Sequence, residues 1–403
     1  MSRGVPVSAP GRFGRAMLAE WRLDPGITYL NHGTVGAPPR RALEAQEAIR
    51  GEIELEPARF LLRELSEIAV GGPRAEPPRL RAAAERVAAF LGAAGKDLVF
   101  VDNATTAVNA VLRSLPFGPG DEIVIADHAY GAIRLAASFR AEETGAVVRD
   151  VAIPGPPYES GAIEAAYAEA ISPRARLLIV DHVTSESALL LPVEAIVARC
   201  RAAGVPVLVD GAHGPGAVPV DVRAIGADWY AANLHKWAFA PRSCGVLWSA
   251  PARQAGLHSP VISWGLGRGF TAEFDWVGTR DPSAWLAAPA GIDWMEELGA
   301  DAVRGHNRTL ARQAAELLTD RWGTARPAPD AMIGPMATVP MPERLGAEPE
   351  DAARVRDRLL FDHRIEVQLH AWRGRLWTRV SAQIYNELGD VERLAEAVSN
   401  LSG

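Results

Sequence analysis

The amino-acid sequence predicts an α/β protein, with a mostly parallel mixed sheet in a large domain and a smaller α+β domain. Short apolar runs rich in β-branched residues, such as Val205–Val209, suit buried parallel strands. Segments with helical spacing separate these runs, as expected where helices connect parallel strands. The chain from about residue 326 to residue 403 alternates short strands and helices, which suits a small α+β unit. We expect the large domain at residues 29–284 and the small domain at residues 1–28 and 285–403.

Composition narrows the classes of function. The chain has 403 residues, of which 48% are hydrophobic and 23% charged, so a sizeable core can form. Its net charge of −7 and the absence of a basic patch with aromatics argue against a nucleic-acid partner. No run approaches the ~18 apolar residues of a membrane span. Two isolated cysteines, Cys200 and Cys244, suggest neither a disulfide framework nor a metal site, and they suit a reducing compartment. We therefore expect a cytoplasmic protein.

The elements before the centre of the chain follow from local signals. Residues 1–20 are expected to form an arm with a short helix. A strand at Tyr29 enters a loop rich in glycine and proline, Asn-His-Gly-Thr-Val-Gly-Ala-Pro-Pro. Helical spacing runs from Arg40 to Glu54 and from Leu80 to Leu91, with a Gly- and Pro-rich break at residues 71–78 between them.

Strand–helix junctions follow in the same order. The apolar strand from Leu98 ends at Asn103, and a helix begins at Ala104 or Thr105. Unpaired backbone amides at such a helix start favour an anion, although a plain N-cap looks the same in sequence. Further strands are predicted at Glu122–Ala126, at Val147–Ile153 (an edge strand) and from Leu177 to Val180. Further helices are predicted from Gly161 and from Leu191 through Cys200.

The most informative stretch runs from Val205 to Trp237. Its strand ends in Asp210, His213 follows three residues later, and a second short segment leads to Asn233, His235 and Lys236. A lysine amine can form a Schiff base with an aldehyde cofactor. An aspartate can hold the protonated pyridine nitrogen of pyridoxal phosphate (PLP). Each residue alone is more often a turn or a surface group. The combination stands out in a chain whose one other lysine is Lys96.

This stretch resembles the cofactor core of class V aminotransferase-fold PLP enzymes, which have PLP fold type I, and especially the isopenicillin N epimerase-like group. The resemblance extends from Tyr29-Leu-Asn-His-Gly to Arg379-Val-Ser. It implies PLP as cofactor and an enzyme that removes the Cα proton of an α-amino acid. In this reading Lys236 holds the cofactor and acts as the base, Asp210 holds the pyridine nitrogen, and His213 lies at the phenolate side.

The resemblance also implies roles for other residues. At the cofactor phosphate it implies Ala104, Thr105 and Thr106, and near the phenolate oxygen it implies Ser185. Asn233 and His235 are expected beside the lysine. Tyr130, rather than His128, is expected to be the catalytic residue that stacks on the cofactor ring. Those assigned to the substrate are Asn31, His32 and Gly33, with Arg379 gripping the α-carboxylate through two parallel hydrogen bonds.

A further loop, Trp276-Val-Gly-Thr-Arg-Asp, resembles the family loop whose glycine and threonine reach the phosphate in the neighbouring subunit. Gly278 and Thr279 therefore imply a homodimer with shared active sites.

We expect an epimerase or racemase, with a C–S or other β-lyase, or an aminotransferase, as the alternatives. Removal of the Cα proton can end in epimerisation or racemisation, in loss of a β-substituent as in a C–S lyase, or in transamination. An epimerase with two bases needs a second acid/base, for which His32, His128, Tyr130 and Ser185 are the candidates. A cysteine desulfurase is disfavoured because neither cysteine lies on a late loop. A non-enzymatic PLP-fold protein should lack Asp210 or Lys236, and a dehydrogenase should show a Gly-x-Gly-x-x-Gly turn after its first strand.

Overall fold

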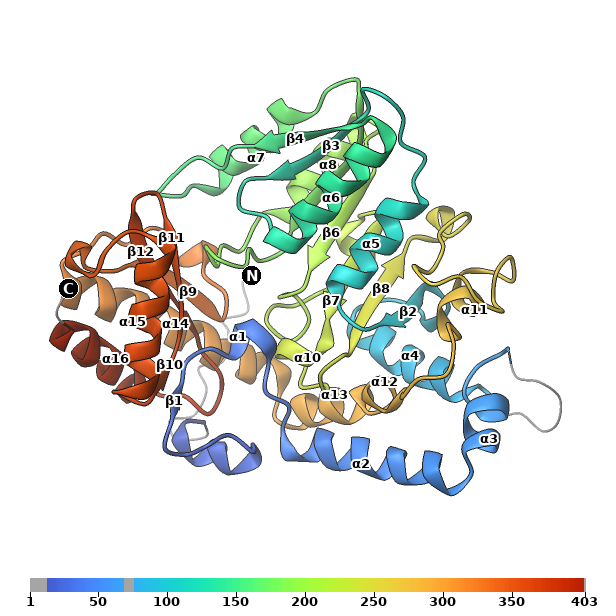
Figure 1. Cartoon of the computed structure of the whole chain (residues 1–403), viewed down its shortest axis with the longest axis horizontal. Coiled ribbons are helices and arrows are strands. Elements are labelled where there is room, and N and C mark those ends of the chain that lie inside the picture. Colours follow the sequence, from blue (N-terminus) through green and yellow to red (C-terminus); the bar gives the residue numbers. More distant parts are fainter. Residues whose placement is uncertain (1–12, 69–75, 402–403) are drawn as a thin grey trace, which may run out of the picture.

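The computed structural model describes residues 13–68 and 76–401. Its main feature is a seven-stranded sheet in the order β2-β8-β7-β6-β5-β3-β4 (Figure 1). Strands β3 to β7 run parallel to their neighbours, whereas β8 runs antiparallel to both β2 and β7. The mostly parallel mixed sheet is therefore confirmed, and β4 has the edge position expected for it. The strands are β2 (Leu98–Val101), β3 (Glu122–Ala126), β4 (Val147–Val151), β5 (Ala175–Asp181), β6 (Val207–Gly211), β7 (Trp229–Asn233) and β8 (Gly245–Ser249).

Helices cover both faces of this sheet, which is why its strands are apolar along their whole length. On one face, Ile123, Ile179 and Leu208 pack with helices α5, α6 and α11. On the other face, Val124, Val180 and Val209 pack with α4, α7 and α8. These helices are α4 (Arg79–Phe90), α5 (Ala104–Ser114), α6 (Gly131–Thr144), α7 (Ser160–Ala170), α8 (Val193–Ala202) and α11 (Phe270–Asp275).

A second, three-stranded antiparallel sheet has the order β11-β12-β9 and lies at the left of Figure 1. Its strands are β9 (Met336–Pro340), β11 (Gln368–Trp372) and β12 (Arg375–Ser381), and its helices are α14 (Ala300–Trp322), α15 (Pro349–Phe361) and α16 (Leu388–Asn400). Leu369, Leu376 and Val380 pack against these helices. Side chains alternate along a strand, so Trp377 and Arg379 leave the opposite face of the sheet.

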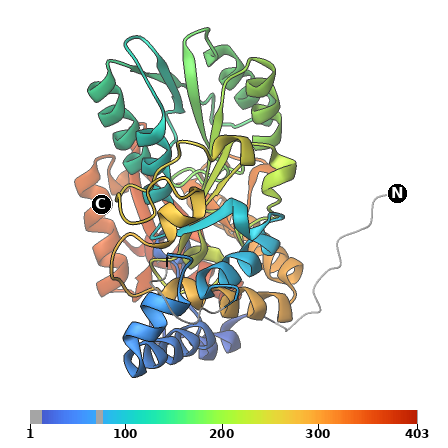
Figure 2. The same cartoon turned by 90° about the vertical axis from the view of Figure 1, so that its right-hand side faces the viewer.

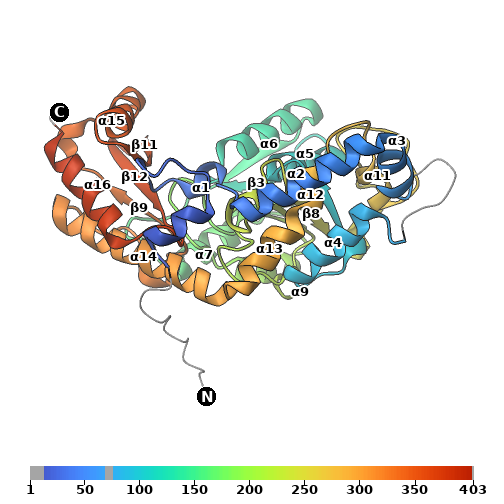
Figure 3. The ribbon, with the colours of Figure 1, turned by 90° about the horizontal axis from the view of Figure 1, so that it is seen from below.

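The N-terminal segment joins this second sheet region. Strand β1 (Thr28–Tyr29) pairs in parallel with β10 (Ile365–Glu366), and Asn31 forms a bridge to Ser381. The chain then continues through α1 (His32–Val35) and α2 (Arg40–Leu55) toward the large sheet. Figures 2 and 3 show α2 lying along one side of the molecule, next to α13 (Ala288–Glu297).

The chain from Ser283 to Trp322 forms three successive helices. They are α12 (Ser283–Leu286), α13 and α14, with Pro289 in the first turn of α13. Gly299, at φ +79°, separates α13 from α14 because it adopts a backbone conformation that other residues rarely take. Ala288 and Ile292 pack in the cluster around the large sheet. The domain division between residues 284 and 285 stays a prediction.

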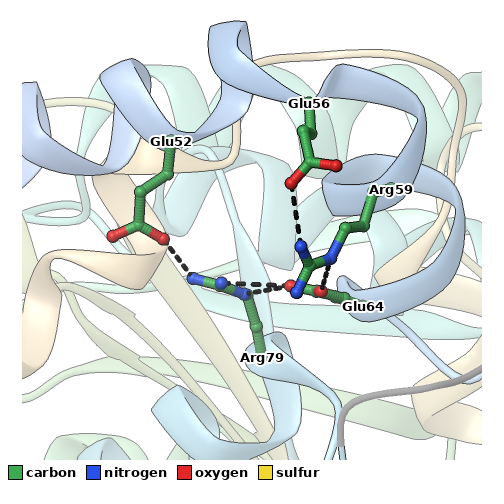
Figure 4. Close-up of polar contacts among 5 residues, drawn as sticks. All are labelled: Glu52, Glu56, Arg59, Glu64 and Arg79. Atoms are coloured by element: carbon green, nitrogen blue, oxygen red, sulfur yellow. Dashed lines mark hydrogen bonds and ion pairs between the residues drawn. The ribbon is translucent and has the colours of Figure 1, made fainter.

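A cluster of ion pairs connects the end of α2 with the turn that follows it and with the start of α4. Arg59 donates to Glu64 at 2.6 Å and to Glu56 at 2.8 Å, and Arg79 donates to Glu64 at 3.0 Å and to Glu52 at 2.7 Å (Figure 4). Glu64 thus joins both arginines. This arrangement holds α3 (Pro57–Arg59) and the π-helical turn Phe60–Glu64 against the end of α2.

Two expectations lie partly outside the described residues, namely the arm within residues 1–20 and the break at residues 71–78. The described part of the first region contains a 3₁₀ helix at Arg15–Glu20. Within residues 13–68 and 76–401, no helix combines the length and the hydropathy needed to cross a membrane.

Candidate active site

A cavity of about 200 Å³ lies beyond the carboxyl ends of β5, β6 and β7. This end of a parallel sheet is where ligands bind in open α/β folds. We call it the lysine cavity, because Lys236 lines it. Many of the residues expected at the cofactor also line it: Ala104, Thr105, Tyr130, Ser185, Asp210, His213, Asn233 and His235.

The amine of Lys236 is held in contact with His213. Lys236 Nζ lies 3.2 Å from His213 Nε2, and the indole N–H of Trp237 donates to His213 Nδ1 at 3.1 Å. Because Nδ1 accepts this bond, the proton of the neutral imidazole must be on Nε2. That N–H points at Lys236 and needs an acceptor, which a neutral amine provides and an ammonium does not. The geometry therefore favours neutral Lys236.

The electrostatics of the cavity agree with a neutral lysine. Burial, and next the charge of Arg379, lower the pKa of Lys236 to about 7, although Asp210 acts in the opposite direction. Burial also holds the pKa of His213 well below its usual value, with the charges of Lys236 and Arg379 adding to the effect. A deprotonated lysine amine is the nucleophile that an aldehyde cofactor requires.

Residues directly after β1, at the start of α1 and just past its end, hold the backbone around Lys236. His32 Nε2 donates to the carbonyl of Lys236 at 2.8 Å, and its Nδ1 lies 2.9 Å from the hydroxyl of Tyr385. Burial lowers the pKa of His32 to about 4, so the ring is neutral. Gly36, at φ +67°, lies so close that a Cβ there would meet the carbonyl oxygen of His235 at 1.9 Å. His32 thus positions the lysine.

Two carboxyl groups lie side by side at the ends of neighbouring strands. Asp181 on β5 is in register with Asp210 on β6, and each residue is 3% exposed. The Ala212 amide donates to Asp210 Oδ1 at 2.9 Å, whereas Asp181 Oδ2 is buried without a partner among the described residues. Burial and the neighbouring Asp210 charge raise the pKa of Asp181 well above its usual value. Burial raises the pKa of Asp210 as well, whereas the Ala212 amide and the charge of Lys236 lower it. Of the two carboxyl groups, Asp181 is therefore the one that keeps a proton and Asp210 the one that carries the charge.

The glycines after Asp210 are required by packing. The ring of Tyr230 lies beneath this turn, and a Cβ on Gly211 would meet it at 2.2 Å. Tyr230 is fully buried, and its hydroxyl lies 2.8 Å from His182 Nδ1. The tyrosine holds the turn between Asp210 and His213 from below.

The start of α5 forms another wall of the lysine cavity. Asn233 Oδ1 accepts from the Ala104 amide at 2.8 Å, and Asn103 Oδ1 accepts from the Thr106 amide at 2.9 Å. These bonds fix the 11-residue helix with its positive end at the cavity. His235 lies nearby, and its Nδ1 donates to the carbonyl of Cys244 at 3.0 Å. A helix start beside an imidazole suits a phosphate group.

Arg379 is a buried cation beside this cavity. It is 3% exposed and donates to the carbonyl of Ser185 and to the hydroxyl of Thr34, both at 2.7 Å. Within the described residues it forms no ion pair, and its Nε has no hydrogen-bond partner. Burial lowers its pKa to about 10. A buried guanidinium bound only to neutral oxygens suits an anionic ligand, because such a charge is costly without a counter-charge. Arg379 is on β12, the central strand of the three-stranded sheet.

Tyr130 and His128 lie on the same turn, but their side chains have different surroundings. Tyr130 lines the lysine cavity and is 48% exposed. The side chain of His128 is 4% exposed, and its Nδ1 lies 2.8 Å from the hydroxyl of Ser187, beside a different cavity. Of the two candidates for the cofactor ring, the structure brings only Tyr130 to the lysine cavity.

Several expected residues do not line this cavity. Asn31 donates to Glu366 at 2.8 Å, Gly33 lies against Met336, and Thr106 bonds back to Asn103. Gly278 and Thr279 are on the loop before α12 and likewise do not line it. Their expected role toward a neighbouring subunit stays a prediction.

The sequence interpretation missed Thr34 and Asp181, both of which line the cavity. Thr34 follows directly after the three loop residues that were singled out. Asp181 could have been found as a second carboxylate that, like Asp210, ends a buried strand. The two thiols are buried, and burial raises the pKa of Cys200 to about 12.

The residues present fit PLP. The cavity offers a neutral lysine amine, a charged carboxylate for the pyridine nitrogen and a helix start for the phosphate. The Nε2–H of His213 suits the phenolate oxygen, since that N–H needs an acceptor. When bound, PLP withdraws electrons from Cα of an amino acid and so makes the Cα–H bond acidic.

Comparisons with known proteins agree with this geometry. Residues 78–355 match the family described as aminotransferase class-V. A putative L-cysteine desulfhydrase 1 from Oryza sativa subsp. japonica is 33% identical, over 93% of this chain and 83% of its own length. An isopenicillin N epimerase from Streptomyces clavuligerus is 34% identical, over 94% of this chain and 96% of its own length.

Solved structures share the fold. The apo structure of a cysteine desulfurase from Thermococcus onnurineus NA1 superposes with a TM-score of 0.79 at 21% identity, covering 98% of this chain and 100% of that one. The fold expected from the sequence is therefore confirmed. The chain belongs to the class V aminotransferase family and is a PLP-dependent enzyme.

Proposed function

We propose that this enzyme is a C–S lyase that removes a sulfur-bound β-substituent from an α-amino acid. The balanced reaction converts a cysteine derivative, R–S–CH₂–CH(NH₃⁺)–COO⁻, and water into R–SH, pyruvate and NH₄⁺. The C–S bond breaks with its electron pair on sulfur. The carrying observation is that the buried amine of Lys236 contacts His213 in this cavity and that its pKa is lowered to about 7, which makes it available as a base. Elimination needs a single base at Cα, and Lys236 supplies it.

The other residues of the site support this role. Lys236 in its neutral form accepts the Cα proton, and the amine then carries that proton toward the departing sulfur. Arg379 binds the α-carboxylate and holds Cα near the amine. Asp210 would hold the pyridine nitrogen of the cofactor and stabilise positive charge on it, and His213 would donate to the phenolate oxygen. The cysteine desulfhydrases among the relatives favour the same class of reaction.

Epimerisation is the second candidate, and Tyr130 is the observation that favours it. Its hydroxyl group belongs to the same cavity as Lys236 and is exposed enough to exchange protons with water. It could serve as the second acid/base of an epimerase, as the isopenicillin N epimerases among the relatives suggest. His32 is a poorer candidate because both of its ring nitrogens are already engaged.

Product analysis separates these candidates. The purified holoenzyme is incubated with L-cysteine, S-methyl-L-cysteine and L-alanine in D₂O. We expect stoichiometric pyruvate, ammonium and thiol from the first two substrates. Recovery of D-amino acid deuterated at Cα, without pyruvate, would overturn the lyase in favour of epimerisation. A requirement for an added oxo acid would indicate transamination.

We also propose a homodimer with shared sites in the cytoplasm. Six exposed apolar side chains lie on α2, on the turn Phe60–Glu64 and on the segment 261–266, and they are Leu55, Leu62, Val261, Ile262, Trp264 and Leu266. A hollow of about 420 Å³, lined by Leu61, Trp264 and Trp276 among others, adjoins them. Exposed apolar side chains beside a hollow suit an interface, so a second copy of this chain is the proposed occupant.

A further inference from the structure

A second cavity lies beside the lysine cavity, between the large sheet and the three-stranded sheet. It has a volume of about 230 Å³, and Tyr158, Trp372 and Trp377 form its aromatic walls, with His128 and His370 between them. The rings of Trp372 and Trp377 are 5.4 Å apart at 63°, and those of His128 and Trp372 are 5.2 Å apart at 84°. We call it the aromatic cavity.

The two cavities are lined by residues that are adjacent in sequence. Ser185 lines the lysine cavity and its carbonyl binds Arg379, whereas Ser187, two residues later, lines the aromatic cavity and contacts His128. In the same way, Tyr130 lines the lysine cavity and the preceding Ala129 lines the aromatic cavity. The segment Ser185–Ser187 therefore runs from the lysine cavity to the aromatic cavity, and its first residue binds Arg379.

Strand β12 sets the spacing between the cavities. Trp377 and Arg379 are two residues apart, so their side chains leave the same face, roughly 7 Å apart along the strand. Opposite Trp377 on β11 is His370, and opposite Arg379 on β9 is Thr338, whose hydroxyl donates to the carbonyl of Glu186 at 2.6 Å. One face of this sheet thus presents a carboxylate-binding group and, next to it, an aromatic wall.

Two imidazole nitrogens in the aromatic cavity have no hydrogen-bond partner within the described chain. They are Nε2 of His128, on a side chain that is 4% exposed, and Nδ1 of His370. The carboxylate of Asp127 is 4.0 Å from His128 Nε2, beyond hydrogen-bond reach. Burial lowers the pKa of His370 to about 4 and also lowers that of His128. Both rings are neutral, so they suit a neutral hydrogen-bonding group. Buried polar atoms left unpaired are costly, and this favours a ligand that pairs them.

We infer that the aromatic cavity binds the side chain of the substrate, and that this side chain carries an uncharged aromatic or heteroaromatic ring. A bare thiol, as in cysteine, would leave both the aromatic walls and the two imidazole nitrogens without a partner. This inference rests on the proposed function, because there the ring is the R group attached to the sulfur of a cysteine derivative.

The test uses amino acids that cannot be cleaved. The ligand 2-amino-5-phenylpentanoate has a methylene in place of the sulfur of S-benzylcysteine, and norvaline is the same molecule without the ring. Each is titrated into the PLP-loaded enzyme, and the change in cofactor absorbance gives Kd. We expect the phenyl ligand to bind about tenfold more tightly or better, because a buried ring removes much apolar surface from water. Equal affinities would overturn the inference.

Variants separate the cavity from a general effect on folding. Trp372→Leu and His370→Leu should reduce the preference for the phenyl ligand to less than about threefold, with the Kd of norvaline unchanged. Phe361→Leu is the matched control, since Phe361 is 72% exposed on α15 and lies outside the cavity, and it should keep the full preference. Retention of the preference in both cavity variants would also overturn the inference.

The outcomes distinguish this inference from the proposed reaction. If the ring-bearing ligand is preferred but no cysteine derivative yields pyruvate, the cavity assignment stands and the lyase proposal fails. If L-cysteine yields pyruvate and the ring gives no gain in affinity, the lyase proposal stands and the cavity assignment fails.

Discussion

At the scale of single residues, the proton on His213 controls the state of Lys236. Trp237→Phe removes the indole N–H that keeps this proton on Nε2. In the native enzyme, capture of PLP by the apoenzyme should become faster as pH rises through about 7, where Lys236 loses its proton. Loss of one hydrogen bond should move this midpoint upward by about 0.5 to 1 pH unit.

Stopped-flow absorbance across the pH range measures this midpoint. Trp294→Phe is a suitable control, because Trp294 is buried in the neighbouring cluster and forms no bond to His213. An unchanged midpoint in Trp237→Phe would show that the tautomer of His213 does not govern the lysine.

The paired carboxyl groups give opposite expectations for two similar substitutions. Asp210→Asn removes the charged partner of the pyridine nitrogen, so turnover should fall on the order of 10² or more. Asp181→Asn replaces a carboxylic acid that is already neutral, so turnover should stay within about threefold of the native value. Steady-state kinetics on both variants, with PLP content measured by absorbance, decide between them. A large loss in Asp181→Asn alone would reverse the two assignments.

Arg379→Lys keeps a positive charge but loses the two parallel hydrogen bonds of a guanidinium. We expect normal PLP content and a KM raised by about tenfold or more for every amino-acid substrate, whatever its side chain. Dialysed protein and a panel of amino acids supply the measurement. Loss of PLP, or a KM that rises for one substrate only, would contradict a general role at the α-carboxylate.

At the scale of elements, sequence patterns predicted the buried strands and many helix starts. A run such as Val205–Val209 is apolar throughout because helices cover both faces of its sheet. The same reasoning could not place His32 behind Lys236, because 204 residues separate them and only the tertiary fold brings them together. It also missed that β12 is a central strand, since strand order is not visible in local spacing.

The ion-pair cluster around Glu64 gives a prediction for the α2–α4 segment. Hydrogen bonds from Arg59, and also from Arg79, lower the pKa of Glu64. A lowered carboxyl pKa adds stability above the unfolded pKa, and this stability is lost as pH falls through the folded value. Glu64→Gln should therefore reduce the free energy of unfolding at neutral pH by about 1 kcal/mol at most, since the partners are solvent-exposed.

Urea unfolding at neutral pH and at a pH below about 4 tests this difference, which should shrink in acid. Glu56→Gln is the control, because Glu56 contacts Arg59 but not Arg79 and should cost less. A difference between Glu64→Gln and the native protein that grows on acidification would contradict the sign.

At the scale of the whole molecule, shared active sites predict complementation between two inactive variants. Lys236→Ala removes the base, and Gly278→Asp should block the loop expected to reach the partner's phosphate. When both are co-expressed with different tags, a mixed dimer has one intact site if the loop acts across the interface. Statistical mixing should restore roughly a quarter of the native activity. Inactive mixed dimers, or a native enzyme that is monomeric by light scattering, would contradict shared sites.

The alternation of side chains along β12 has a consequence for how this family can diversify. Arg379 and Trp377 share one strand but face different parts of a bound amino acid. Substitutions at position 377, or at His370 opposite it, should therefore alter substrate specificity without affecting how Arg379 binds the α-carboxylate. Proteins with this strand can therefore change substrate specificity by single substitutions and stay active at each step. This suits a family whose relatives include both desulfhydrases and epimerases.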